Sequence, residues 1–151
     1  MWPDPEVASF VNDRFVPARV HVKEDGARFA AVSERFGAPW TPTILLIDPE
    51  GVERHRIEGF LPKDELLAQL MLGLAHVAFH ARQFDEAAAQ FDAVIQKFPR
   101  TEAAPEAQYW AGVARYKGTG DATHLGATAQ AFTQTYQDSV WAKKASVWKP
   151  G

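Results

Sequence analysis

The chain of 151 residues contains no cysteine. Thiol–disulfide exchange needs a thiolate as its nucleophile, so the chain as it stands cannot perform this reaction. It also lacks an apolar run of the ~20 residues that a membrane-spanning helix requires. Its Lys and Arg residues are scattered, and its net charge is −3. We therefore expect neither a membrane span nor a nucleic-acid partner, since nucleic-acid binding depends on a basic surface.

Motifs of catalysis and cofactor binding are missing as well. The sequence has no G-x-S-x-G, no phosphate-binding loop and no G-x-G-x-x-G. His76 and His80 lie one helical turn apart, but no third ligand is recognisably placed beside them, and we predict two surface histidines. No catalytic residue, metal site or cofactor is predicted. The N-terminus has neither the basic region nor the apolar stretch of a signal peptide, so we expect a cytoplasmic protein.

The hydrophobic content of 46% suffices for a core. Two short helices are predicted near the N-terminus. Asp4 followed by Pro5 is typical of a helix start, because Asp accepts bonds from free amides and Pro fits the first turn. A second helix is predicted over residues 27–36, with Gly37 as its C-terminal stop. Between them, alternating valines over residues 16–22 predict a strand.

A hairpin is predicted after these helices. Thr43–Ile47 is a continuous apolar run, as expected for a strand buried on both faces. Asp48–Gly51 has the composition of a turn. Val52–Ile57 is mostly charged, which fits a returning strand at the edge of a sheet.

The rest of the chain is predicted to be helical. One helix runs from Pro62 to about Gln83 and is apolar on every side, so we expect it to be buried all round and shared between two layers. Further helices are predicted over residues 84–98, 102–117, 124–136 and 139–148.

The order of predicted elements over residues 5–72 resembles that of the thioredoxin family from its first helix onward. The motif Thr41-Pro42-Thr43, the turn at residues 48–51 and Gly59 match this family as well. The resemblance implies a three-layer α/β thioredoxin-like domain over residues 1–72. The CxxC pair of the family is absent, and its first central strand would precede the region where this chain begins.

The resemblance also implies a binding surface. In the family, the proline before the central antiparallel strand is cis, lies beside the CxxC pair and helps to grip extended polypeptide. Here that proline is Pro42, and the candidate polypeptide-binding residues are Trp40, Thr41, Pro42 and Thr43. Trp40 has a second interpretation, as a lid that fills the space left by the missing strand, although Trp is also favoured at binding hot spots.

The missing strand would lie between Ala18–Val22 and Thr43–Ile47. Three repairs are open: direct pairing of these two strands, a lid built from Trp2 and Trp40, or a strand from another chain. Direct pairing needs the least material. We therefore predict a three-stranded mixed sheet, in which Ala18–Val22 is parallel to the central strand and Val52–Ile57 is antiparallel to it.

Residues 68–135 resemble tetratricopeptide repeats. The spacings Ala75 to Ala87, Ala87 to Phe91 and Phe91 to Pro99 are 12, 4 and 8, as the 34-residue repeat requires. A second repeat is weaker, because Gly112 and Phe132 lie 20 rather than 16 residues apart. The resemblance implies an all-α array with a capping helix over residues 62–151, and the helix at residues 62–83 would belong to both domains.

Both resemblances are to polypeptide-binding architectures. They imply a redox-inactive, non-catalytic protein that binds a polypeptide partner as an adaptor or holdase-like chaperone. Bacterial proteins that join a thioredoxin domain to such repeats in protein quality control are the nearest analogy. The alternative is a truncated thioredoxin-type protein-disulfide oxidoreductase that acts in cell redox homeostasis. The oligomeric state is left open, and strand exchange is one option.

Overall fold

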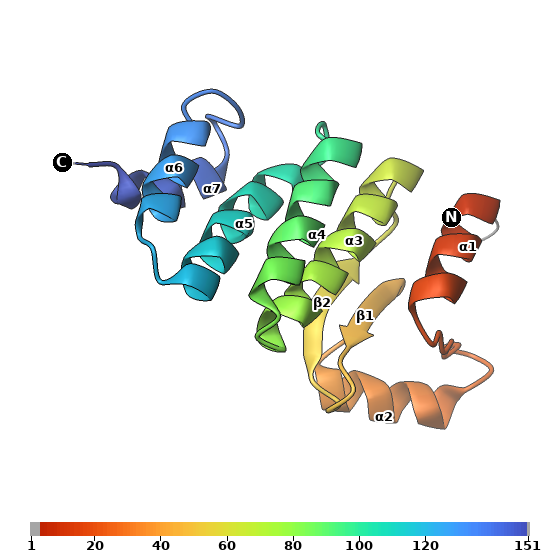
Figure 1. Cartoon of the computed structure of the whole chain (residues 1–151). Helices are drawn as coiled ribbons and strands as arrows, with labels where there is room; N and C mark the ends of the chain where they lie inside the picture. Colours follow the sequence, from red (N-terminus) through yellow and green to blue (C-terminus); the bar gives the residue numbers. More distant parts are fainter. Residues whose placement is uncertain (1–3, 151) are drawn as a thin grey trace. The chain divides into compact units, whose positions relative to one another are not determined.

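The computed structural model describes residues 4–150 (Figure 1), so the Trp2 lid lies outside the described residues. The chain divides into two compact units, residues 1–63 and 64–151. The first unit holds two helices and a hairpin, and the second is built from helices. Each unit is described by itself.

Local sequence signals set the limits of the two helices in the first unit. Helix α1 (Pro5–Arg14) begins after Asp4, whose carboxylate accepts hydrogen bonds from the amides of Glu6 and Val7 at 2.9 and 3.3 Å. Helix α2 (Gly26–Phe36) ends at Gly37, which has a left-handed φ of 58°. Glycine adopts this conformation without the steric penalty of a Cβ atom. Both predicted helix limits are confirmed.

The predicted hairpin is confirmed. Strand β1 (Thr43–Ile47) pairs antiparallel with strand β2 (Glu53–Glu58), and Leu45 lies opposite Arg56. In the turn between them, the Asp48 carboxylate accepts amide hydrogen bonds from Glu50 and Val52 at 3.0 and 2.9 Å. Gly51 completes the turn with a positive φ of 83°.

The predicted third strand is wrong. Within residues 4–150 the sheet has only β1 and β2, and Ala18–Val22 is not a strand. Val16 is fully exposed and Val22 is nearly half exposed, so the alternating valines bury little apolar surface. A short extended segment gains too little from pairing when burial does not offset the entropy lost by ordering it. Pro17 also lacks an amide hydrogen to donate.

Strand β1 is less buried than its apolar sequence predicts. Only Leu46 is fully buried among its residues, and Ile47 at its end is 44% exposed. A central strand would have neighbours on both edges, whereas β1 has one neighbour within the part of the chain that is described. The expectation of burial on both faces depended on the absent third strand and is corrected with it.

The second unit consists of helices that follow one another along the chain, and α3 to α5 lie side by side (Figure 1). Helix α3 begins at the last residue of the first unit and continues through the second, so its role as a shared helix stays a prediction. The predicted helix at residues 62–83 ends earlier than expected, because Arg82 takes a φ of 63° between α3 and α4. The elements are α3 (Lys63–His80), α4 (Phe84–Lys97), α5 (Ala103–Thr119), α6 (Thr123–Ala131), α7 (Val140–Ala145) and the 3-10 helix η1 (Ser146–Trp148).

Alanines, together with Leu72, Val94 and one large aromatic residue, form the core cluster of the second unit. Alanines of α3, α4 and α5, among them Ala75 and Ala87, are fully buried, and Phe91 lies among them with no exposed surface. Small side chains let paired helices approach closely, and Phe91 fills the space between them. Helices α5 and α6 approach closely as well: a Cβ atom at Gly112 would lie 1.9 Å from the hydroxyl oxygen of Thr128.

Candidate polypeptide-binding site

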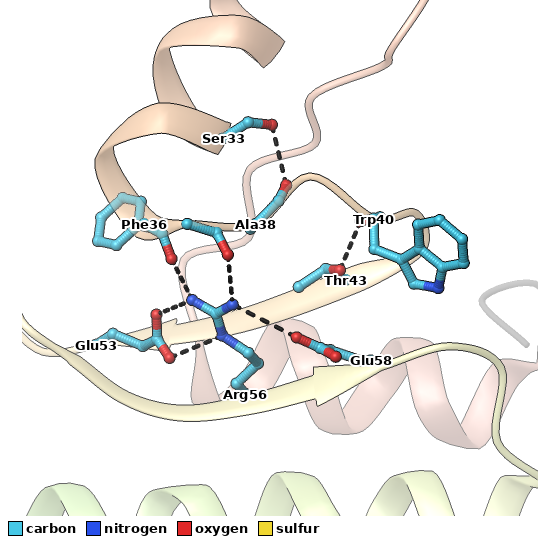
Figure 2. A network of polar contacts seen from close by, with 9 residues as sticks. Ser33, Phe36, Ala38, Trp40, Thr43, Glu53, Arg56 and Glu58 are labelled. Carbon is cyan, nitrogen blue, oxygen red and sulfur yellow. Dashed lines mark hydrogen bonds and ion pairs between the residues drawn. The ribbon is translucent and has the colours of Figure 1, made fainter.

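The loop that carries the candidate residues is held by its own backbone. The peptide bond between Thr41 and Pro42 is cis, as the resemblance implies. The Pro42 carbonyl accepts a hydrogen bond of 2.8 Å from the amide of Gly59, directly after β2. The Thr43 hydroxyl donates to the Trp40 carbonyl at 2.6 Å, which closes the loop on itself (Figure 2). These bonds fix the backbone of the loop and leave its side chains uncommitted to a core.

Two large apolar side chains beside this loop face solvent. Trp40 is 70% exposed, and Phe60, which follows Gly59, is 78% exposed. A side chain as exposed as Trp40 covers little core, so its interpretation as a lid is wrong. Phe60 was not among the candidate residues, because a single Phe after a strand carries no signal in the sequence. The hydrogen bond between Gly59 and Pro42 brings the segment containing Phe60 to the loop.

An arginine on β2 ties the hairpin to the end of α2. The Arg56 guanidinium donates to the carbonyl oxygens of Phe36 and Gly37, the latter at 2.9 Å (Figure 2). The last carbonyls of a helix are free acceptors at the negative end of its dipole, so a cation is stabilising there. Arg56 also forms ion pairs with Glu53 at 2.6 Å and with Glu58 at 3.4 Å. The hydrogen bonds that Arg56 donates to the Glu53 carboxylate raise the pKa of Arg56 above its ordinary value, against the opposing effect of desolvation.

Carboxylates stabilise the first unit at two further points. Hydrogen bonding from the Val52 amide and from Arg54, whose Nε lies 2.7 Å from the carboxylate, lowers the pKa of Asp48 although desolvation opposes the shift. Lys63 pairs with Asp4 at 3.6 Å and with Glu6, and the bond to Glu6 raises the pKa of Lys63. These groups hold the turn and the start of α1, and they offer no free acid or base near Pro42.

Residues 1–73 match the family model described as a thioredoxin-like domain. The first unit is a thioredoxin-like domain. No curated protein and no solved structure matches the chain. The matched region contains β1, β2 and the cis-proline loop, so the predicted family of this half is supported by both its sequence and its hairpin.

The thioredoxin-like domain has exposed aromatic side chains at this loop and no thiol. The sequence supplies no cysteine beside Pro42 or elsewhere. What the loop offers is a fixed backbone with two exposed aromatic side chains, Trp40 and Phe60. Such groups can contact apolar side chains of an extended polypeptide.

One of the two histidines of α3 is buried. In residues 4–150 there is no group of three His, Asp or Glu side chains that could hold an ion. His76 was predicted to lie on the surface, but it is 8% exposed and contacts Glu106 at 2.8 Å between its Nε2 and the carboxylate. Its ring meets the rings of Phe91 and Trp110 edge to face. The all-round burial of α3 explains this placement, because no side of the helix is free for a histidine near its middle.

None of the helices described is long and apolar enough to cross a membrane. The helical unit does contain a hollow of about 400 Å³. The Ser139 hydroxyl in its lining donates to the Tyr136 carbonyl at 2.7 Å. The residues that line it are Gln69, Glu102, Pro105, Glu106, Ser139, Val140 and Trp141.

Proposed function

We propose that the thioredoxin-like domain is a non-catalytic module that binds extended, apolar polypeptide segments at Trp40, Thr41, Pro42, Thr43 and Phe60. The observation that carries the proposal is the exposure of Trp40 and Phe60, each within two residues of the hydrogen bond between Pro42 and Gly59. Neighbouring exposed apolar side chains mark interaction surfaces, and Trp is enriched at binding hot spots.

The fixed backbone of the loop supports this function physically. Binding is weakened by the entropy of ordering the groups that make contact, so a loop that is already held loses less freedom when a partner arrives. The carbonyl of Pro42 and the hydroxyl of Thr43 are both engaged within the domain. The large side chain of Trp40 is therefore presented from a stable base.

We propose further that the helical unit is a tetratricopeptide-like array, so that the whole protein acts as an adaptor or holdase-like chaperone. The spacing from Ala75 through Ala87 and Phe91 to Pro99 supports the repeat, and the first three of these residues are buried in the core. Disulfide oxidoreduction is the less favoured function, because this chain contains no thiol.

Binding of a permanently unfolded, fluorescently labelled protein tests the proposal by anisotropy. Trp40→Ala and Phe60→Ala should each weaken binding about tenfold or more, as expected for aromatic hot spots. Val147→Ala is the matched control, because Val147 is also 78% exposed but lies in η1 of the other unit. Equal losses in all three variants, or no binding by the unaltered protein, would contradict the proposed site.

A further inference from the structure

The hollow in the helical unit combines carboxylates with an aromatic ring. Its volume of about 400 Å³ lies within the range of roughly 300–1,000 Å³ that is typical of ligand pockets. Its walls come from three parts of the chain: Gln69 of α3, Glu102 and Glu106 at the start of α5, and Trp141 of α7. Of the described residues that line it, none is Lys, Arg or His, so its walls are negatively charged.

The carboxylate of Glu106 is held in place from α3. Its Oε2 lies 2.8 Å from Nε2 of His76, and the His76 ring packs edge to face against Phe91 and Trp110. The histidine is fixed by this packing, and it therefore orients the carboxylate that it contacts. A group that is oriented before a ligand arrives loses less freedom on binding.

The carboxylate of Glu102 is exposed and has no such partner. Within residues 4–150 it forms no ion pair, while its backbone amide donates to the Glu65 carboxylate at 3.1 Å. The positive end of a helix dipole favours acidic residues, which accounts for carboxylates at the start of α5 as such. It does not account for their place in the wall of a hollow that also contains the ring of Trp141.

The ring of Trp141 already attracts a cation of this chain. The ammonium nitrogen of Lys144 lies 4.3 Å from the ring centroid, and the faces of aromatic rings, above all of Trp, attract cations. The rings of Tyr109 and Trp110 pack against Trp141 at centroid distances of 5.2 and 6.5 Å and keep it in place. Lys144 offsets part of the negative charge near the hollow but does not line it.

We propose that this hollow binds a cationic side chain of a polypeptide partner, and arginine best. A guanidinium group is planar, donates to carboxylates from a rigid fork and stacks on aromatic rings. Glu102 and Glu106 supply the acceptors, and Trp141 supplies the ring. The inference rests on the proposed function only in that the helical unit binds polypeptide, and it does not involve the loop at Pro42.

The ligand is an organic cation rather than a metal ion. In the part of the chain that the structure describes, no three His, Asp or Glu side chains come together as metal ligands. An indole ring contributes nothing to the usual ligand sets of metal ions, which are oxygen, nitrogen and sulfur atoms. It does contribute to the binding of ammonium and guanidinium groups.

Matched peptides test the ligand on the full chain. They share one sequence of Gly, Ser and Ala residues and carry Arg, citrulline or Glu at a single central position. Binding is followed by heteronuclear NMR at the indole N–H signals of the tryptophans. The Arg peptide should shift the signal of Trp141 and bind about tenfold more tightly than the peptide with citrulline, which has the shape of arginine without its charge.

Substitutions at Glu102 test the site. Glu102→Gln should remove most of the difference between the Arg and citrulline peptides, and Glu102→Lys should reverse the preference, so that the Glu peptide binds more tightly than the Arg peptide. An unfolded variant would not show such a reversal. Glu86→Gln is the matched control, because Glu86 is also an exposed residue at the start of a helix, α4, but does not line the hollow. It should leave every affinity unchanged.

The outcomes separate this inference from the proposed function. An Arg peptide that binds no better than the citrulline peptide, or a preference for Arg that survives Glu102→Lys, would overturn it. A shift of the Trp40 signal in place of Trp141 would overturn it as well, because binding would then lie at the loop. Trp40→Ala should leave the preference for Arg unchanged. If Trp40→Ala also leaves the binding of an unfolded protein unchanged, the proposed site at the loop fails and the hollow does not.

Discussion

The two units of this protein are stabilised in different ways. In the helical unit, alanines, Leu72, Val94 and Phe91 from α3, α4 and α5 form a continuous buried cluster. In the thioredoxin-like domain, polar bonds to the backbone hold the turns and helix ends, as Asp4, Asp48 and Arg56 illustrate. Large apolar side chains of that domain, such as Trp40, remain exposed.

This difference shows how one chain can combine a buried cluster with exposed aromatic side chains on a fixed loop. Burial of apolar area is the main stabilising contribution in the cluster of the helical unit, so a side chain such as Phe91 is not available to a partner. Directed hydrogen bonds stabilise a loop without covering it. The domain can therefore keep Trp40 and Phe60 in solvent and still hold their backbone in place.

The largest expected effect on stability distinguishes a buried phenylalanine, Phe91, from an exposed one, Phe60. Phe91→Ala should lower the free energy of unfolding by about 3–5 kcal/mol, because the substitution removes a fully buried ring and leaves a cavity. Phe60→Ala makes the same change at an exposed position and should shift stability by no more than about 0.5 kcal/mol. Urea unfolding followed by circular dichroism measures both. Equal losses would show that the two units do not differ as described.

A smaller effect is expected where two helices of the second unit touch. Gly112→Ala places a Cβ atom 1.9 Å from Thr128 Oγ1, so the helices must shift and stability should fall by about 1–3 kcal/mol. Gly126→Ala is the matched control, because its nearest atom lies 4.0 Å away. Alanine favours a helix over glycine, so this control should be neutral or stabilising. A stable Gly112→Ala protein would contradict the close approach of α5 and α6.

The smallest effect concerns pH and the turn of the thioredoxin-like domain. The pKa of Asp48 is lowered in the folded protein, chiefly by the Val52 amide, so folding favours the ionised carboxylate. Its contribution is present above the ordinary carboxyl pKa of about 3.9 and is lost as pH falls through the lower folded value. Thermal unfolding between pH 6 and pH 2 should show a shallower loss of stability in Asp48→Asn than in the unaltered chain. Asp138→Asn, at an exposed site of the other unit, controls for the substitution, and identical pH profiles for Asp48→Asn and the unaltered chain would contradict the role of Asp48.

Features controlled by neighbouring residues were predictable from the sequence. The cap at Asp4, the stop at Gly37 and the turn at Asp48–Gly51 each depend on a few adjacent residues, and the structure contains all three. The position of Pro42 in the candidate loop was predicted from the resemblance to a family, and the matched region includes it. The composition of Thr43–Ile47 was likewise sufficient to predict a strand.

Features that depend on a distant partner were not predictable in the same way. The valines of residues 16–22 have the alternation of a strand, but alternation does not specify a neighbour, and no strand forms there. His76 has the sequence context of a helix residue, yet its burial beside Glu106 depends on α5. Phe60 became part of the candidate site only through the bond between Gly59 and Pro42.

The sequence by itself determined the helix caps, the hairpin turn, the apolar strand and the absence of thiol chemistry, because each follows from the conformational or chemical properties of a few residues. Only the tertiary structure decided that the sheet has two strands in the described chain, that Arg56 holds the end of α2, and that Trp40 lies in solvent. The physical reason is that pairing and burial depend on which groups meet across long separations in sequence. Which of these groups come into contact depends on the free energy of the whole fold rather than on any local pattern.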